Sequence, residues 1–288
     1  MHTPYAIDPH LSLGVVTLKV RDLDAQTAFY QDVIGLRLLA QDSHACTLGV
    51  TGGPCPVLRL AHAPEGCHRP DATGLFHLAL VLPSRAALGT WAARYTATHR
   101  LNGAGDHGVS VALYLDDPEG NGIEVYWDRP RAAWPRDRAG DLQFGTHAVD
   151  LASLTGAARD DAPDGLPPGT RLGHIHLRVN DTQLSHAFYH TVLGFEVMSR
   201  HSDLAFFGAG GYHHHIGANT WQSRGAPLRP SDALGLARYE LLFSDAASRD
   251  TVVARLESAG VQHRVDGNTT SVTDPAGLGV VLGVAEAA

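Results

Sequence analysis

The sequence predicts an α+β fold in which four βαβββ modules form two curved-sheet barrels with their helices outside. Two observations carry this prediction. Residues 13–36 (LGVVTLKVRDLDAQTAFYQDVIGL) align without a gap on residues 172–195 (LGHIHLRVNDTQLSHAFYHTVLGF), at an offset of 159. The turn DPEGNG at 117–122 returns as DPAGLG at 274–279. A single βαβββ sheet is open and curved, so two sheets must pair to close a cavity.

The first module runs from about 12 to 63. Its VVTLKV segment alternates as a strand does, and DLDAQTAFYQDVI has helical spacing that ends at Gly35. Three strand-like segments follow, LRLLA, ACTLGV and PVLRLAH. The second module, at 74–128, repeats the plan with FHLALVLP as a strand and SRAALGTWAARYTATHRL as a helix. Two further strands are expected on either side of the DPEGNG turn.

The third and fourth modules cover 171–222 and 235–284. Between the two pairs of modules lies a stretch rich in proline, arginine, aspartate and glycine, with a short helical segment near HAVDLASLTGA. The predicted organisation is therefore a first domain at 1–132, a connector at 133–168 and a second domain at 169–288.

Composition excludes several classes of function. The 288 residues suffice for two domains at roughly 150 residues each, and a net charge of −8 argues against nucleic-acid binding. No apolar run approaches the ~18 residues that span a bilayer, and the N-terminal stretch lacks the pattern of a signal peptide. Cys46, Cys55 and Cys67 form no CxxC pair, so we expect reduced thiols in a cytoplasmic protein. The sequence leaves open whether the protein is a monomer or a homo-oligomer.

Histidine is the compositional outlier, with 18 residues. Most are expected at the surface, but some fall at equivalent positions of the repeat. Val15 aligns with His174, so an apolar residue and a metal-capable imidazole occupy the same place in two copies. This asymmetry indicates one working site and one that has lost its ligands.

The repeat plan, with FY-x-x-V-[IL]-G and DP-x-G-x-G-[IV], resembles the vicinal oxygen chelate superfamily of glyoxalase I, bleomycin resistance proteins and extradiol dioxygenases. The resemblance covers nearly the whole chain apart from the connector. It implies metal ligands on the first and last strands of each module, facing the cavity. Modules 1 and 4 place Val15, Arg59, Arg238 and Val281 there, whereas modules 2 and 3 place His77, Glu124, His174 and a histidine from 213–215.

Pairing of neighbouring modules would split these ligands between two incomplete sites. Pairing of module 2 with module 3, and of module 1 with module 4, gives one complete site and one empty site. The sequence thus argues for cross-domain pairing, with the site where residues 74–128 meet residues 171–222.

The inward histidine of the run depends on strand phase. Because Ile216 is apolar and faces the helices, His215 takes the inward phase, and His214 is the alternative if a bulge at Gly210 and Gly211 shifts it. A surface cluster is the competing interpretation.

Glu124 gives the stronger argument for a metal. A lone strand histidine such as His77 is more often a hydrogen-bonded core residue, but a carboxylate within the apolar strand GIEVYW needs a partner. Two histidines and one carboxylate are the facial triad of non-haem Fe(II) oxygenases, and also suit Mn(II), Zn(II) or Ni(II). Three histidines and one glutamate would instead resemble a glyoxalase-type site.

Residues 106–126 resemble the extradiol dioxygenase signature. Tyr114 lies ten residues before Glu124, and His107 opens the preceding strand, although the segment between His107 and Tyr114 is two residues shorter than in the family. The resemblance implies that both side chains hydrogen-bond the substrate oxygen and the developing peroxide charge. A loop histidine and a packing aromatic are the competing interpretations.

Residues 210–225 and the AVDLASL segment are similar to CatE-type catechol or hydroquinone ring-cleaving dioxygenases. The expected function is therefore Fe(II)-dependent, extradiol-type cleavage of a small aromatic diphenol by O₂. Module 4 lacks both ligand types, so the ligand order of catechol 2,3-dioxygenases does not apply. A glyoxalase I-like Zn or Ni lyase or isomerase is one alternative, and a non-catalytic small-molecule binding protein is another.

Overall fold

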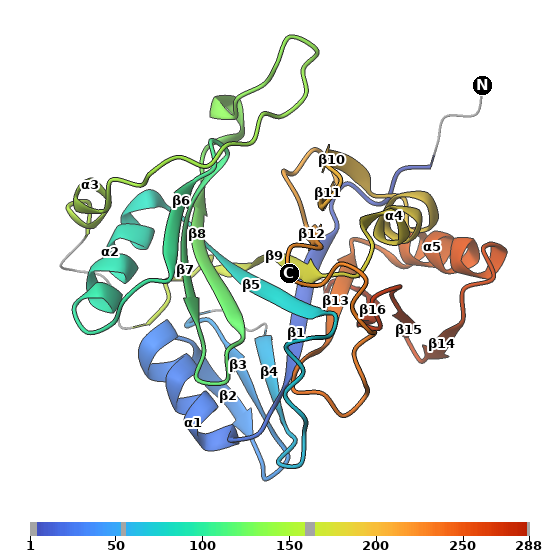
Figure 1. Ribbon diagram of the computed structural model, residues 1–288, viewed down its shortest axis with the longest axis horizontal. Helices are drawn as coiled ribbons and strands as arrows, with labels where there is room; N and C mark the ends of the chain where they lie inside the picture. The colour runs from blue at the N-terminus through green and yellow to red at the C-terminus, as the bar shows by residue number, and fades with distance from the viewer. Residues whose placement is uncertain (1–4, 53–55, 159–164, 287–288) are drawn as a thin grey trace. The chain divides into compact units, whose positions relative to one another are not determined.

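The strands of the protein form two eight-stranded sheets in the computed structural model, which describes residues 5–52, 56–158 and 165–286 (Figure 1). One sheet has the order β14-β15-β16-β13-β1-β4-β3-β2. The other has the order β10-β11-β12-β9-β5-β8-β7-β6. The predicted α+β class, with two curved sheets and few helices, is confirmed.

Module 1 contains β1 (Ser12–Val20), α1 (Leu23–Ala28), the π-helical turn η1 (Phe29–Ile34), β2 (Arg37–Gln41), β3 (Ala45–Gly49) and β4 (Pro56–His62). Module 2 contains β5 (Gly74–Leu82), α2 (Arg85–Thr96), β6 (Gly103–Asp106), β7 (Ser110–Asp116) and β8 (Gly122–Asp128). The connector carries η2 (Arg131–Ala133) and α3 (Leu151–Thr155), the latter where a short helix was expected.

Module 3 contains β9 (Arg171–Arg178), α4 (Thr182–His186), η3 (Ala187–Val192), β10 (Glu196–Arg200), β11 (Leu204–Gly208) and β12 (Ile216–Asn219). Module 4 contains β13 (Gly235–Phe243), α5 (Ala246–Ser258), β14 (His263–Asp266), β15 (Thr269–Thr273) and β16 (Gly279–Val284). Helices α1, α2, α4 and α5 each pack on strands of their own module. All four modules therefore share the βαβββ plan.

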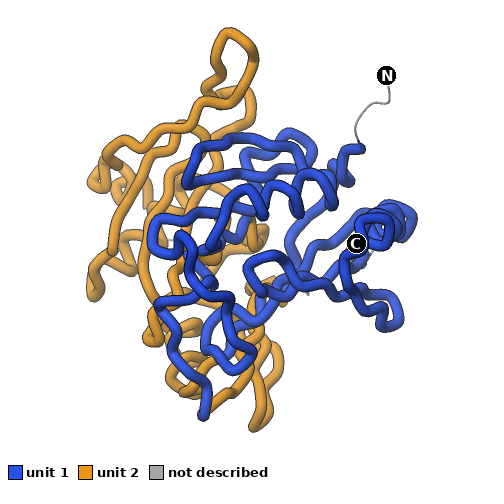
Figure 2. The backbone as a smooth tube through the Cα atoms, turned by 45° about the vertical axis from the view of Figure 1, so that its right-hand side comes forward, with its two compact units in different colours: residues 1–19, 65–76, 174–288 blue, residues 20–64, 77–173 orange. Residues whose placement is uncertain are grey.

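The chain divides into two compact units (Figure 2). Unit 1 consists of residues 1–19, 65–76 and 174–288, and unit 2 of residues 20–64 and 77–173. Strands β1, β5 and β9 each contribute residues to both units. The domain boundaries expected from the repeats stay a prediction.

The two repeated motifs meet in a buried hydrogen bond inside each unit. In unit 2, the hydroxyl of Tyr30, from the FY motif, donates to the Asp117 carboxylate of the DPEGNG turn at 3.1 Å. In unit 1, the equivalent Tyr189 donates to Asp274 of the DPAGLG turn at 2.7 Å. Both tyrosines are fully buried, so the motifs recur because each unit uses them to fasten a helix to a turn.

Three local expectations need correction. Helix α2 ends at Thr96, before the predicted end at Leu101, and β6 was not predicted. The run 213–215 does not lie in a strand, since β12 begins only at Ile216. Gly210 and Gly211 adopt φ of 57° and 69°, so the chain enters the run through a left-handed turn. The bulged strand considered for these two glycines is not formed.

No helix in the described part of the chain has the length and apolar character needed to cross a membrane. Cys46 and Cys67 are free thiols, and Cys55 lies outside the described residues.

Candidate metal centre

Neighbouring parallel strands bring His77 and Glu124 together. Strand β5 pairs with β8 in a register that sets Ala79 opposite Glu124. His77 Nε2 lies 2.9 Å from Glu124 Oε2, and the two side chains are only 7% and 4% exposed. On either side of Glu124, Ile123 and Val125 are core residues, so the carboxylate stands in an apolar strand as expected. A charge buried to this degree is stable only when it is compensated.

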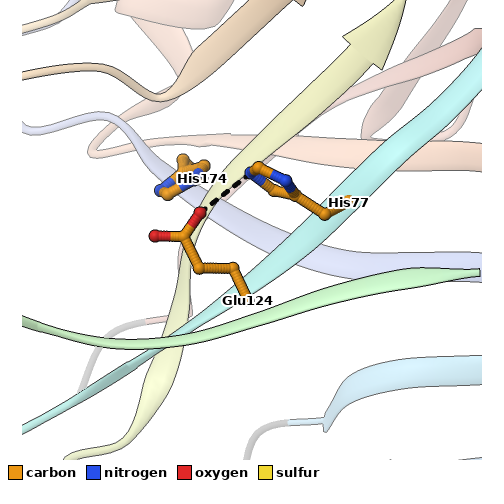
Figure 3. A group of neighbouring side chains, drawn as sticks. All are labelled: His77, Glu124 and His174. Atoms are coloured by element: carbon orange, nitrogen blue, oxygen red, sulfur yellow. Dashed lines mark ion pairs between the residues drawn. The ribbon is translucent and has the colours of Figure 1, made fainter. Parts of the chain in front are cut away.

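His174, on β9, completes a group of three side chains (Figure 3). The potential ligand atoms of His77, Glu124 and His174 all lie within 4.8 Å of one another, and all three residues are buried. Two imidazole nitrogens and one carboxylate oxygen form a donor set that first-row divalent metals accept. The residues therefore fit a divalent metal, because one cation would compensate the buried carboxylate and coordinate both imidazoles.

The predicted pair His107 and Tyr114 is hydrogen-bonded. His107 Nδ1 lies 2.9 Å from the carbonyl oxygen of Gly145, which only accepts, so Nδ1 carries the proton. In the neutral imidazole Nε2 is then an acceptor, and the Tyr114 hydroxyl donates to it at 2.8 Å. This contact excludes simple aromatic packing as the whole role of Tyr114.

Tyr114 also lies directly opposite Glu124 in the β7–β8 hairpin. Burial raises the pKa of the Tyr114 phenol well above its usual range, and the negative charge and hydrogen bonding of Glu124 raise it further. The phenol therefore stays protonated, with one hydrogen that serves either the His107 ring or the Glu124 carboxylate.

The histidine run is buried, which excludes the surface-cluster interpretation. His213, His214 and His215 are 1%, 8% and 8% exposed. The His214 ring lies 4.2 Å from the His174 ring and stacks on Phe206 at the same centroid distance. His215 Nδ1 accepts a hydrogen bond from the backbone N–H of Ala209 at 3.2 Å, so this nitrogen is not available to a metal. Neither His214 nor His215 belongs to the group of three described above.

Sequence reasoning missed His176. Its ring is 4% exposed, and its Nε2 lies 3.1 Å from the Asn219 side-chain amide. Alternation along β9 puts His176 on the same face as His174, so the sequence held a signal that could have found it. The outer-module positions carry no comparable group in the described residues: Arg59 and Arg238 are exposed, Val281 is buried, and the Val15 backbone N–H donates to Glu240.

A family model described as the Glyoxalase/Bleomycin resistance protein/Dioxygenase superfamily matches residues 12–125 and 171–282. The chain belongs to this superfamily. The match covers all four modules and leaves out the connector, as the repeat analysis expected.

Individual relatives span nearly the whole chain. A protein of Bacillus subtilis (strain 168) named catechol-2,3-dioxygenase is 40% identical over 272 residues, which are 93% of this chain and 94% of the relative. Among solved structures, a putative dioxygenase from Bacillus subtilis covers 98% of this chain and 87% of its own, with a TM-score of 0.65 and 13% identity. Glyoxalase I from Zea mays covers 95% and 92%, with a TM-score of 0.54 and 18% identity. The two structural likenesses establish the shared fold.

Proposed function

We propose that this protein is an Fe(II)-dependent, extradiol-type dioxygenase that cleaves the ring of a catechol or hydroquinone. The observation that carries the proposal is the buried group of His77, Glu124 and His174. A relative named catechol-2,3-dioxygenase at 40% identity supports the reaction class. The proposed partners are a small aromatic substrate and O₂, and a cytoplasmic location stays a prediction.

We further propose that modules 2 and 3 supply all the metal ligands. The order β9-β5-β8 within one sheet supports this assignment, since His174, His77 and Glu124 come from those strands. The outer modules offer Val15 and Val281 at the equivalent places. His215, with His214 as the alternative, stays a predicted further ligand.

Iron, when bound, would supply open coordination positions and would relay electrons from the diphenol, which is the reductant, to O₂. The protein residues do the rest. His77, Glu124 and His174 would hold the ion on one face and leave the opposite face for substrate. The Tyr114 hydroxyl donates a hydrogen bond to His107 Nε2. When the phenol oxygen accepts a second proton, the original phenol proton passes to His107 Nε2. The Gly145 carbonyl holds the other ring nitrogen, so His107 receives that proton without turning.

The test begins with anaerobic purification and reconstitution with Fe(II). O₂ consumption and a yellow ring-fission product are then measured with a panel of catechols and hydroquinones. We expect uptake with at least one diphenol, and none with the same protein loaded with Zn(II). Absence of uptake with every diphenol, together with tightly bound Zn or Ni in the purified protein, would assign the glyoxalase-type alternative instead.

A further inference from the structure

Two arginine side chains of unit 1 converge over Gly74, the first residue of β5. A Cβ atom built on Gly74 would lie 3.2 Å from Arg229 Nη1 and 3.4 Å from Arg178 Nη2. Arg178 is the last residue of β9, and Arg229 lies in the segment between β12 and β13. Glycine at position 74 therefore leaves room for both guanidinium groups beside the strand.

Among the described residues, this arginine pair has only neutral hydrogen-bond partners. Arg178 Nη1 donates to the carbonyl oxygen of Pro70 at 3.3 Å, and Arg229 Nη2 donates to the carbonyl oxygens of Ala233 and Leu234. Within the described ranges, neither guanidinium forms an ion pair, and the buried Nε of Arg178 has no hydrogen-bond partner. At least one N–H of the pair is thus unsatisfied by the described part of the chain.

Two like charges in a partly buried place are unfavourable. Burial lowers the pKa of both groups, and that of Arg229 falls to about 10, with the positive charge of Arg178 as the second cause. Both guanidinium groups nevertheless stay protonated at neutral pH, so the pair keeps two positive charges. An anion that accepts from both guanidinium groups would remove the repulsion and satisfy the open N–H.

Arg178, one member of the pair, lies on the face of β9 that carries His174. Residues 174, 176 and 178 alternate along the strand, so they share one face, and four residues correspond to about 13 Å. Between the two ends, the His176 ring lies 5.1 Å from the Phe76 ring, which in turn lies 5.4 Å from Trp221. The rings of His176, Phe76 and Trp221 therefore pack together beside this part of β9.

We propose that Arg178 and Arg229 form a binding site for a carboxylate. The planar fork of each guanidinium matches a carboxylate with two parallel hydrogen bonds, which a single ammonium group would not provide. The carboxylate is either the end of a substituent on the diphenol ring or a separate small acid. The first source rests on the proposed function, whereas the second does not.

The first experiment measures binding of phenylacetate to the metal-loaded protein by titration calorimetry in a low-salt buffer. We expect Arg178→Gln and Arg229→Gln each to weaken binding at least tenfold, about 1.4 kcal/mol. Gly74→Ala, which keeps both charges but crowds them, should also weaken it. The matched control is Arg69→Gln, since Arg69 already pairs with Asp71 at 2.9 Å and should not affect binding. Arg229→Lys is the conservative variant, because it keeps the positive charge and loses only the planar fork. Weaker binding by this variant would therefore not be explained by loss of folding.

Unchanged binding in all arginine-pair variants would mean that phenylacetate binds to the metal, and this result would overturn the proposal. Absence of any binding would overturn it as well. The second experiment separates the two sources by comparing 3,4-dihydroxyphenylpropionate with its methyl ester as substrates. A preference for the free acid that Arg178→Gln abolishes through KM assigns the substrate carboxylate. Equal rates for acid and ester, with phenylacetate binding intact, assign a separate acid. If no diphenol is turned over, the proposed function fails while the calorimetry still decides the site.

Discussion

Asp274 makes the stability of unit 1 depend on pH. Its carboxylate accepts hydrogen bonds from the backbone N–H groups of Ala276 and Leu278 at 2.9 and 2.8 Å, and from the Tyr189 hydroxyl at 2.7 Å. The Tyr239 hydroxyl lies 2.6 Å from that of Tyr189. Despite these donors, burial raises the pKa of Asp274 to about 6.

The size of the effect follows from this shift. An unfolded chain returns the aspartate pKa to about 3.9, so the difference of roughly 2 pH units corresponds to about 3 kcal/mol. The folded state binds the proton more tightly. The stabilising contribution of Asp274 is therefore fully present below about pH 4, and it is lost as the pH rises to about 6.

Asp274→Asn should remove this dependence. The amide oxygen still accepts from the two backbone N–H groups, and the amide nitrogen donates to Tyr189, whose hydroxyl then turns to Tyr239. Urea unfolding between pH 4 and pH 7 measures the free energy of unfolding for both proteins. The variant should gain up to about 3 kcal/mol relative to the wild type between pH 4 and pH 6.

Asp117 in unit 2 serves as the matched comparison. Burial also raises its pKa, and it accepts from Tyr30 as Asp274 does from Tyr189. Asp117→Asn should therefore change the pH profile in the same direction. A constant difference between wild type and Asp274→Asn across this pH window would refute the reasoning.

Three further predictions follow from the site and its scaffold. Tyr114→Phe should lower kcat by about 10²–10⁴-fold with the metal content unchanged. Loss of the metal would instead show that Tyr114 helps to hold the metal. Removal of the metal by a chelator should lower the unfolding free energy by about 2.7 kcal/mol when the free metal was at 100 times its Kd, and an unchanged melting temperature would argue against a site in the folded core. Gly89→Ala should destabilise the protein by about 1–3 kcal/mol in urea unfolding, because its Cβ would meet the Leu154 carbonyl, and a neutral result would contradict the α2–α3 packing.

The repeat predicted the modules because local alternation and spacing determine strands and helices. Its limit shows at 213–215, because the strand alternation expected there does not extend through the histidines. Two glycines with positive φ turn the chain before β12 begins. Because glycine adopts positive and negative φ about equally readily, the sequence alone does not predict this turn.

Long-range contacts were the other limit. The FY and DP-x-G motifs are visible in the sequence, but the contact between Tyr30 and Asp117 joins residues 87 positions apart, which no local pattern specifies. The same holds for Arg178 and Arg229, which resemble ordinary surface arginines in the sequence. Glu124 was predictable because a carboxylate in an apolar strand needs a partner wherever the chain goes.

The most direct test of the proposed centre is the amount of metal bound per chain. Elemental analysis after reconstitution with Fe(II) should give one ion per wild-type chain. His77→Ala, Glu124→Ala and His174→Ala should each lose it, whereas Val15→Ala and Val281→Ala should keep it. Retention of the ion by His174→Ala, or two ions per wild-type chain, would contradict a single centre made by modules 2 and 3.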